Sequence, residues 1–483
     1  VRVLTGREAV SLDSDSRTVA ARNLLNGESE TYSYDELIIA VGASAVLPQI
    51  EGISLPGVFK MRTPDDAEEI RSYIERVSAK KAVIIGAGFI GLEVADNLFE
   101  KGIQITVIDS ADQILPGVLD SELADYVRRF LAKKGIRFIT GVRVDRIVGA
   151  DRAEGVSTSY GILDADIVVS AAGIRPNTDF LKNCGIEMDR GVIKTDAQLK
   201  TNLPHVYAAG DCAMVTNRIT GMAQWSPMGS SANMEARTLA QLLTGMDKHY
   251  PGVLGTGVVK LPGLNCGRTG LGEMQAAKAG FNVETAVAVT DDKAHYYPDS
   301  SFFITKLIAD KNTHKLLGAQ VIGPGAVDKM IDIAVTGINL GARIEDFENA
   351  DYAYAPPFST AIHPFVQAAL ILMNKLDGDL DSFTPAQYAA GEAEGYRVID
   401  VAPSPSLRGA EWIDLTKVDG PVDGSPKDEK LLLVCVKGKR GYFLQRRLKA
   451  YGYTNTKVLE GAAFVNQVKI KNAGVAVAPS DIA

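Results

Sequence analysis

The spacing of hydrophobic residues changes repeatedly along the chain, between short apolar runs and helix-like periods. Apolar residues run together at 34–42, 82–85, 104–109 and 167–173, where we expect buried strands. The first 25 residues alternate between apolar and polar positions, as paired strands do. Strands that alternate with helices favour parallel sheets with both faces covered, so the fold class is α/β. Helical spacing predicts helices over 65–77, 89–101, 120–134, 230–243, 272–280, 325–340, 360–374 and 442–451.

The composition excludes several broad classes of protein. With 483 residues and roughly 150 residues per domain, the chain has room for about three domains. Hydrophobic residues make up 46% and charged residues 23%, and the apolar runs are far shorter than the roughly 20 residues of a membrane helix. A net charge of -8 argues against nucleic acid as the main ligand. The 4 cysteines are too few for a disulfide framework, which favours a reducing cytoplasm.

A glycine-rich turn marks a candidate nicotinamide nucleotide site. The motif is G-x-G-x-x-G at residues 86–91, which follows the predicted strand 82–85 and opens the predicted helix 89–101. Gly86 therefore permits the tight turn, and Gly88 lets backbone amides approach a pyrophosphate. Gly91 lets the helix pack closely on the strand. The next strand ends in Asp109, which can accept hydrogen bonds from a ribose and repel a 2'-phosphate, so NADH is favoured over NADPH. Alternatives are a purely structural turn, or NADPH binding helped by nearby basic residues. The candidate cofactor residues here are Gly86, Gly88, Phe89, Ile90, Gly91, Glu93 and Asp109.

Four segments together resemble one enzyme family. The segments 34–48, 86–93, 167–181 and 206–213 are similar to motifs of the pyridine nucleotide–disulfide oxidoreductases. In that family a hydrophobic strand that ends in Ala-x-Gly marks the passage of the chain between the FAD and NAD domains. The resemblance therefore implies cofactor positions at Gly42 and Gly173. It also implies that Gly210 and Asp211 bind FAD, with Asp211 facing the ribityl chain. The alternative for Asp211 is a helix N-cap or turn residue.

The region 251–375 narrows this resemblance to the coenzyme A-disulfide reductase branch, which includes NADH-dependent persulfide and polysulfide reductases. The similarity lies in the segments 295–298 and 352–359. In that branch such tyrosines come from the partner subunit of a homodimer and lie near the flavin and the reactive sulfur. Tyr297 and Tyr354 are therefore candidate catalytic residues, because a phenol can hydrogen-bond a thiolate and donate a proton. The alternative for both is ordinary interface packing.

Two features of this family are not found in the sequence. Its members begin with an FAD-binding strand and glycine turn, and this branch then carries one redox cysteine; we expect both in a natural N-terminal segment that precedes Val1. On that expectation, the present chain alone binds FAD weakly and lacks reductase activity. Cys184, Cys212 and Cys266 do not match the redox segment, and we expect each to be a small buried hydrophobic residue.

Residues 381–470 resemble a rhodanese domain, a sulfur-transfer module. The resemblance lies in 398–401, 409–413 and 435–440, the last of which matches the active loop pattern C-x-x-G-x-R. Cys435 follows a predicted strand and precedes a helix, where loop amides, Lys437, Lys439 and Arg440 would stabilise a thiolate. Cys435 and Arg440 are candidate catalytic residues. Ala402 stands where the family usually has arginine, so a degenerate module that serves only for docking is the alternative.

These expectations combine into one architecture and one reaction. The fold comprises two interleaved Rossmann-like FAD and NAD domains, an α+β dimerisation domain and a rhodanese-like α/β domain. NADH would reduce FAD, which would pass two electrons to a disulfide or persulfide; coenzyme A is a possible ligand and no metal site is expected. Alternatives are an NADH oxidase or peroxidase, and a nucleotide-binding sulfur carrier without turnover. The predicted domains are 1–60 with 173–248 (partial FAD-binding), 61–172 (NAD(P)H-binding), 249–376 (dimerisation) and 382–483 (rhodanese-like).

Overall fold

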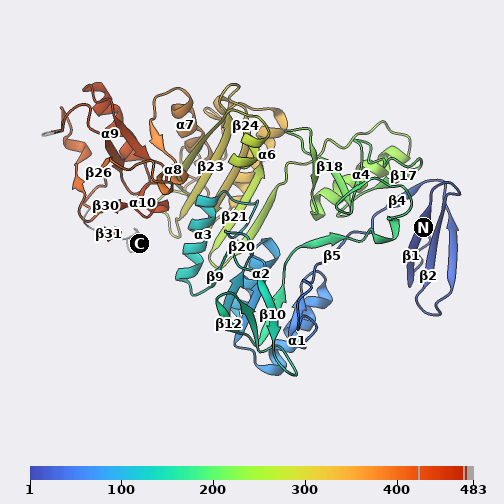
Figure 1. Ribbon diagram of the computed structural model, residues 1–483. Coiled ribbons are helices and arrows are strands. Elements are labelled where there is room, and N and C mark those ends of the chain that lie inside the picture. Colours follow the sequence, from blue (N-terminus) through green and yellow to red (C-terminus); the bar gives the residue numbers. More distant parts are fainter. Residues whose placement is uncertain (423–424, 471–473, 476–483) are drawn as a thin grey trace. The chain divides into compact units, whose positions relative to one another are not determined.

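The chain forms two compact units, each built from several discontinuous segments (Figure 1). The structure is a computed structural model, and it describes residues 1–422, 425–470 and 474–475. The first unit comprises 1–79, 146–154 and 167–255, and the second comprises 80–145, 155–166 and the chain from 256 onward. Parts of the predicted 382–483 domain therefore lie outside the described residues. None of the helices in the described part has the length and apolar character needed to cross a membrane.

The first unit begins with the alternating segment, which forms the antiparallel sheet β1-β2-β3. Its apolar side packs on a core that contains Ile39, Val206 and Ala208, and these residues lie on the parallel pair β4 and β17. The predicted strand 34–42 is confined to Leu37–Ile39. The bounds are β1 (Arg7–Asp13), β2 (Thr18–Asn23), β3 (Ser29–Ser33), β4 (Leu37–Ile39), β5 (Ala43–Ala45), β6 (Val58–Lys60), α1 (Pro64–Val77), β13 (Ile167–Ser170), β14 (Ile174–Pro176), β15 (Met188–Asp189), β16 (Val192–Lys194), β17 (Val206–Ala208), β18 (Ala213–Thr216), β19 (Ala223–Trp225) and α4 (Gly229–Leu243), with a 3-10 turn at Asp179–Leu181.

The second unit opens with the predicted strand-helix-strand segment, and β10 (Val144–Val148) lies where the chain leaves that segment. Strands β7, β8 and β9 pair in parallel in that order. Helix α2 buries Leu92, Ala95 and Leu98, which are spaced three residues apart and therefore lie on one side of the helix. The bounds are β7 (Lys81–Ile85), α2 (Phe89–Glu100), β8 (Gln104–Ile108), α3 (Ser121–Lys133), β9 (Arg137–Ile139), β11 (Gly155–Thr158) and β12 (Gly161–Asp164).

An antiparallel sheet of order β20-β21-β24-β23-β22 follows in the second unit. Helices α6 and α7 pack on it and bury Met330, Ile331, Phe365 and Leu372 (Figure 1). Helix α7 begins at Pro364, four residues later than predicted, because His363 caps it and proline is favoured in the first turn. The bounds are β20 (Gly257–Leu261), β21 (Leu264–Gly270), α5 (Glu273–Lys278), β22 (Val283–Asp291), β23 (Phe302–Asp310), β24 (Leu316–Gly323), α6 (Val327–Leu340) and α7 (Pro364–Leu376), with a 3-10 turn at Ile344–Phe347.

The C-terminal part of the second unit is a parallel sheet of order β25-β29-β28-β26-β27. The residues of β28 and Cys435, which follows it, point alternately into two cores. Leu431, Leu433 and Cys435 pack with α9, whereas Leu432 and Val434 pack with α10. Helix α9 begins at Lys439, three residues before the predicted start. The bounds are β25 (Ser382–Phe383), α8 (Pro385–Ala389), β26 (Arg397–Asp400), β27 (Glu411–Trp412), β28 (Leu431–Val434), α9 (Lys439–Ala450), β29 (Thr456–Leu459), α10 (Ala462–Val465), β30 (Lys469–Ile470) and β31 (Gly474–Val475), with a 3-10 turn at Leu415–Lys417.

Candidate functional site

The glycine turn between β7 and α2 has the shape of an anion-binding loop. Gly86 has φ +112°, which favours glycine, and its N–H donates to the carbonyl of Ile108 at 2.7 Å. Gly88 is the N-cap of α2, and no side chain of the described residues caps the helix there. An added Cβ at Gly88 would meet no described atom within 4 Å, so the space in front of the helix is open. The amides of this helix end can therefore bind a pyrophosphate.

Asp109 directly follows β8 and braces the same turn. Its carboxylate accepts the N–H of Ala87 at 2.6 Å and the N–H of Ala111 at 2.8 Å. These bonds hold the acid beside the turn, where it can also accept hydrogen bonds from a ribose. Among the other predicted residues, Phe89 and Ile90 are half-buried, Gly91 is buried and Glu93 is exposed.

The candidate flavin residues gather around the end of β17 in the first unit. Asp211 forms an ion pair with Arg62, which lies just before α1. Gly210 has φ +79°, and its N–H donates to the buried Glu235 of α4 at 2.7 Å. Burial raises the pKa of Glu235 despite this hydrogen bond. Sequence analysis missed Arg62 and Glu235, because no local pattern distinguishes them from other charged helix or loop residues.

Gly42 and Gly173 lie on two segments that run side by side within the first unit. Both have positive φ, +65° and +110°, and an added Cβ at either would meet no described atom within 4 Å. The strands that follow them, β5 and β14, pair antiparallel, and the N–H of Val46 donates to the carbonyl of Gly173 at 2.9 Å. The open backbone at both glycines, together with Asp211, fits part of an FAD site.

Three of the cysteines are buried or half-buried. Cys212 and Cys266 are fully buried, and burial raises the pKa of both thiols. Cys184 was expected to be buried as well, and this was wrong: it is half-buried after a 3-10 turn, where its Sγ donates to the carbonyl of Leu181 at 3.1 Å. A thiol with a raised pKa stays protonated at neutral pH, so Cys212 and Cys266 are poor nucleophiles.

The two candidate tyrosines are exposed on adjacent segments of the second unit. Tyr297 is 39% exposed and Tyr354 is 51% exposed. The N–H of Ala294 donates to the carbonyl of Pro356 at 3.3 Å, so the segments that carry the tyrosines lie side by side. Both phenols are therefore accessible on this single chain.

Cys435 lies at the end of β28 and is followed by a tight loop into α9. It is 3% exposed, and its Sγ accepts the N–H of Gly438 at 3.1 Å. Arg440 donates from Nε to the carbonyl of Val401 at 2.6 Å, while its Nη2 is buried and has no partner among the described residues. Lys437 was expected to add positive charge to the loop, and its ammonium is paired with Asp291.

The segment where the rhodanese pattern departs is held by a buried carboxylate. Asp400 ends β26 and accepts the N–H groups of Ala402, Ser406 and Leu407 at 2.9, 2.5 and 2.9 Å. Trp412 donates from Nε1 to the carbonyl of Ala402 at 2.9 Å. The short segment after Ala402 is therefore ordered by Asp400 without an arginine at that position.

Three carboxylates with metal-like spacing surround a buried lysine. Asp120, Glu122 and Glu273 offer oxygens within 4.8 Å of one another. Lys306 is fully buried and pairs with all three, at 2.8 Å from Asp120 and 2.6 Å from Glu273. Burial opposes the charge of Lys306, but the three carboxylates outweigh it and raise its pKa. The ammonium of Lys306 thus occupies the position that a metal ion would take among the three carboxylates.

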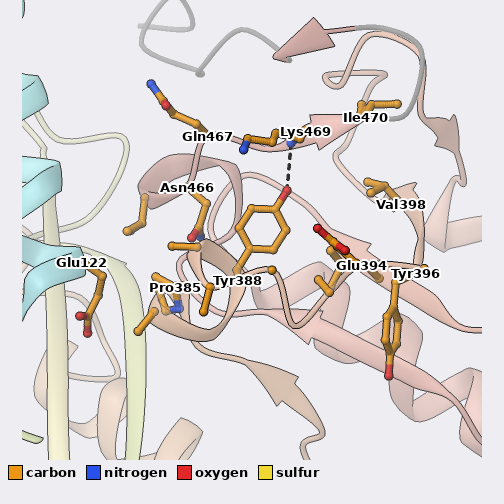
Figure 2. A pocket seen from close by; sticks show the side chains of 18 of the residues that line it. Glu122, Pro385, Tyr388, Glu394, Tyr396, Val398, Asn466, Gln467, Lys469 and Ile470 are labelled. Carbon is orange, nitrogen blue, oxygen red and sulfur yellow. Dashed lines mark hydrogen bonds between the residues drawn. The ribbon is translucent and has the colours of Figure 1, made fainter.

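A cavity of about 1430 Å³ lies between α3 and the C-terminal sheet (Figure 2). Tyr388 points into it, and its hydroxyl accepts the N–H of Lys469 at 2.9 Å. Glu122 and Arg129 line it from α3, and Arg129 is already bonded to Asp125 and to the carbonyl of Val465. Among its described lining residues, none belongs to the loop after Cys435 or to the glycine turn.

Known proteins resemble this chain in sequence and structure. The NAD(P)H sulfur oxidoreductase (CoA-dependent) of Pyrococcus furiosus is 36% identical over 348 residues, which cover 72% of this chain and 78% of that protein. The NADH oxidase of Methanocaldococcus jannaschii is 32% identical over 376 residues, covering 78% and 84%. The solved structure of a NAD-dependent persulfide reductase from A. fulgidus superposes with a TM-score of 0.89 at 34% identity, covering 96% of this chain and 85% of that one.

Sequence profiles define the family. Residues 1–232 match the pyridine nucleotide-disulphide oxidoreductases, and residues 258–365 match the dimerisation domain of the same enzymes. The predicted family, its FAD and NAD(P)H cofactors and a dimerisation region are thereby confirmed at the level of the family. The predicted enzyme class is confirmed as well, and the chain is an oxidoreductase. These matches agree with the glycine turn that can bind one nucleotide and with the residues that fit part of a site for a second. This chain belongs to the pyridine nucleotide-disulphide oxidoreductase family.

Proposed function

We propose that this protein uses NADH to reduce the sulfur of a disulfide, persulfide or polysulfide, with coenzyme A derivatives as substrates, and that its C-terminal module transfers sulfane sulfur through Cys435. The observation that carries this proposal is the Cys435 loop, in which a backbone N–H faces the sulfur at the end of a parallel strand. Support also comes from a relative that is named as a CoA-dependent sulfur oxidoreductase.

The chain's own residues divide the proposed work between them. Gly86, Gly88 and Asp109 bind and orient the dinucleotide, and the carboxylate of Asp109 favours NADH because it would repel the 2'-phosphate of NADPH. Gly210 and Asp211 contribute to the binding of FAD, which supplies the two-electron relay between nicotinamide and sulfur when bound. The overall reaction converts a persulfide, NADH and a proton into a thiol, hydrogen sulfide and NAD⁺.

The position of the Cys435 thiol supports the proposed sulfur transfer. The Cys435 thiolate attacks the outer sulfur of a donor such as thiosulfate, so a new S–S bond forms and sulfite leaves. The Gly438 amide that bonds Sγ, together with the start of α9, stabilises negative charge on the thiolate and on the sulfur that it gains. Arg440 anchors the loop to Val401.

Tyr297 and Tyr354 are assigned to the flavin-side reaction of a partner subunit. Both phenols are accessible on the single chain, and the region 258–365 matches a dimerisation domain. A phenol placed near a leaving thiolate can donate the proton that it needs. On this proposal the homodimer is the catalytic form.

Anaerobic turnover tests the reductase activity. NADH oxidation is followed with coenzyme A persulfide, with coenzyme A disulfide and without an acceptor, for the present chain and for the chain extended by the FAD-binding, cysteine-containing segment that the family resemblance implies. Acceptor-dependent NADH loss is expected only of the extended, FAD-loaded chain. NADH loss that requires oxygen and ignores both sulfur compounds would instead establish an NADH oxidase, the activity for which one relative is named. An extended chain that binds NADH but neither holds flavin nor turns over would be a nucleotide-binding carrier.

Thiosulfate:cyanide sulfur transfer tests the C-terminal module separately. Cys435→Ser should abolish thiocyanate formation, because no thiolate remains to carry the sulfur. Cys184→Ser, at the half-buried thiol of the first unit, is the matched control and should retain the activity. Unchanged transfer in Cys435→Ser removes Cys435 from the proposed function.

A further inference from the structure

The loop after Cys435 is held by residues outside its own sheet. The carbonyls of Cys435 and Val436 accept the N–H groups of Ala463 and Phe464, each at 3.1 Å. The side chain of Lys437 pairs with Asp291, the last residue of β22. Asp291 belongs to the antiparallel sheet of the region that matches the dimerisation domain, and it is 146 residues from Lys437 in the sequence. The loop is thus bound both to its own module and to a separate one.

The loop also reaches that sheet through Phe464, at the cross-strand residue pair that contains Asp291. Asp291 lies directly opposite Phe302 in the pairing of β22 with β23. The ring of Phe302 meets the ring of Phe464 edge to face, with centroids 4.6 Å apart. Tyr126 of α3 stacks on Phe464 at 6.1 Å. One cross-strand pair therefore reaches the Cys435 loop twice, through the charge of Lys437 and through the backbone of Phe464.

The ion pair decides how much positive charge the loop presents. Lys437 and Asp291 are 35% and 34% exposed, so water screens their attraction and the pair contributes little to folding stability. Its effect on a nearby sulfur is different, because an unpaired ammonium favours a thiolate and an unpaired carboxylate disfavours it. Other charged groups lie on the elements around the loop. They are Lys439, Arg440, Arg446, Arg447 and Lys449 on α9, Asp400 on β26, Asp414 beside Arg440, and Asp292 with Lys293 directly after Asp291.

We propose that Asp291 is a positioning residue for the sulfur-transfer site: through Lys437 it fixes the loop of Cys435 and sets the charge that its sulfur experiences. This inference rests on the proposed function of Cys435. It makes the reactivity of the C-terminal module depend on the sheet to which that module is attached. Lys437 is partly neutralised in the intact protein, and its charge is released when Asp291 is removed or drawn away.

The test measures the alkylation of Cys435 by iodoacetamide as a function of pH, in the full chain, with the modified peptide quantified by mass spectrometry. Asp291→Asn should move the midpoint to lower pH, because Lys437 is left unpaired, and should raise the rate at neutral pH about threefold. Lys437→Gln should move the midpoint to higher pH, because Asp291 is left unpaired. The exchanged pair Asp291→Lys with Lys437→Glu should return the midpoint toward that of the unmodified protein, and Asp291→Glu should preserve it.

Asp379→Asn is the matched control, because it breaks another partly exposed ion pair of the C-terminal module, with Arg446 on α9. Its midpoint should stay unchanged. Midpoints that move in the same direction in Asp291→Asn and Lys437→Gln, or that do not move in either, overturn the inference. Alkylation needs no sulfur donor, so these outcomes are decided even if the unmodified protein forms no thiocyanate, a result that would instead remove the proposed sulfur transfer.

Discussion

The N–H of Ala87, inside the glycine turn, donates a hydrogen bond to the carboxylate of Asp109 at 2.6 Å. The acid that is assigned to nucleotide recognition therefore also braces the loop that would bind the pyrophosphate. A second bond from Ala111 leaves the carboxylate little freedom to rotate. Pre-ordering both contacts before the nucleotide arrives reduces the entropy lost on binding.

Replacement of this acid should weaken NADH binding and shift the preference toward NADPH. Asp109→Asn removes the negative charge that repels a 2'-phosphate and weakens the bond from Ala87. Since hydrogen bonds to charged groups contribute about 1.5 to 3 kcal/mol, the Kd of NADH should rise about tenfold or more. Fluorescence titration with both nucleotides measures this. Asp112→Asn, at an exposed acid of the same loop, should leave both affinities unchanged. An unaltered NADH to NADPH ratio in Asp109→Asn would argue against its role in recognition.

A methyl group at Gly88 should block the nucleotide without disturbing the fold. Gly88 has φ -78°, which alanine adopts freely, and an added Cβ meets no described atom within 4 Å. Gly88→Ala should therefore melt near the temperature of the unmodified protein, while the Kd of NADH rises about tenfold or more because the methyl group takes the space of the pyrophosphate. Gly86→Ala is the contrasting variant, since φ +112° makes it lose stability as well. Unchanged NADH binding in Gly88→Ala would place the nucleotide elsewhere.

Local patterns in the sequence were sufficient to predict the elements on which the site is built. The apolar run before Gly86 and the helical spacing after it became β7 and α2, with the helix ending one residue earlier than predicted. The strand before Cys435 and the helix after it were likewise predicted, because each depends on residues that are near in sequence. Errors were concentrated at element ends, as at His363, where a cap rather than periodicity decides the boundary.

Contacts between distant segments could not be predicted in this way. Arg62 meets Asp211 across 149 residues, and Lys437 meets Asp291 across 146. Neither partner carries a local signal, since a charged residue in a loop is usually exposed and solvated. The sequence suggested that Lys437 adds positive charge to the loop, and only the three-dimensional arrangement shows the carboxylate of Asp291 that compensates this charge.

Removal of the buried ammonium at Lys306 should strongly destabilise the second unit. Lys306→Met leaves Asp120, Glu122 and Glu273 close together without a compensating cation. Loss of one partner from a buried ion pair costs about 3 to 5 kcal/mol, so the apparent melting temperature should fall markedly. Lys311→Met is the matched control: its ammonium is largely exposed and pairs with Glu284, so its loss should cost less than about 1 kcal/mol. Equal effects in the two variants would mean that the carboxylate cluster tolerates the missing charge.

His363 should make the stability of the protein depend on pH. It caps α7 by accepting the N–H of Phe365 on Nδ1 at 3.2 Å, and burial, followed by the charge of Lys329, lowers its pKa from 6.5 to about 4. The unfolded chain therefore binds a proton at higher pH than the folded chain does. The stability that depends on neutral His363 is complete above pH 6.5 and is lost as the pH falls toward 4, by about 2 to 3 kcal/mol in total.

His363→Asn keeps a side-chain acceptor at the N-cap but does not titrate, so it should remove this part of the pH dependence. Thermal melting at closely spaced pH values between neutral and acid conditions measures the difference between the two proteins. The melting temperatures should separate as the pH falls, with the His363 protein melting lower, because only the protein with His363 loses its cap to protonation. Curves that stay parallel over the whole range would show that His363 is already protonated, or equally free to protonate, in the folded chain.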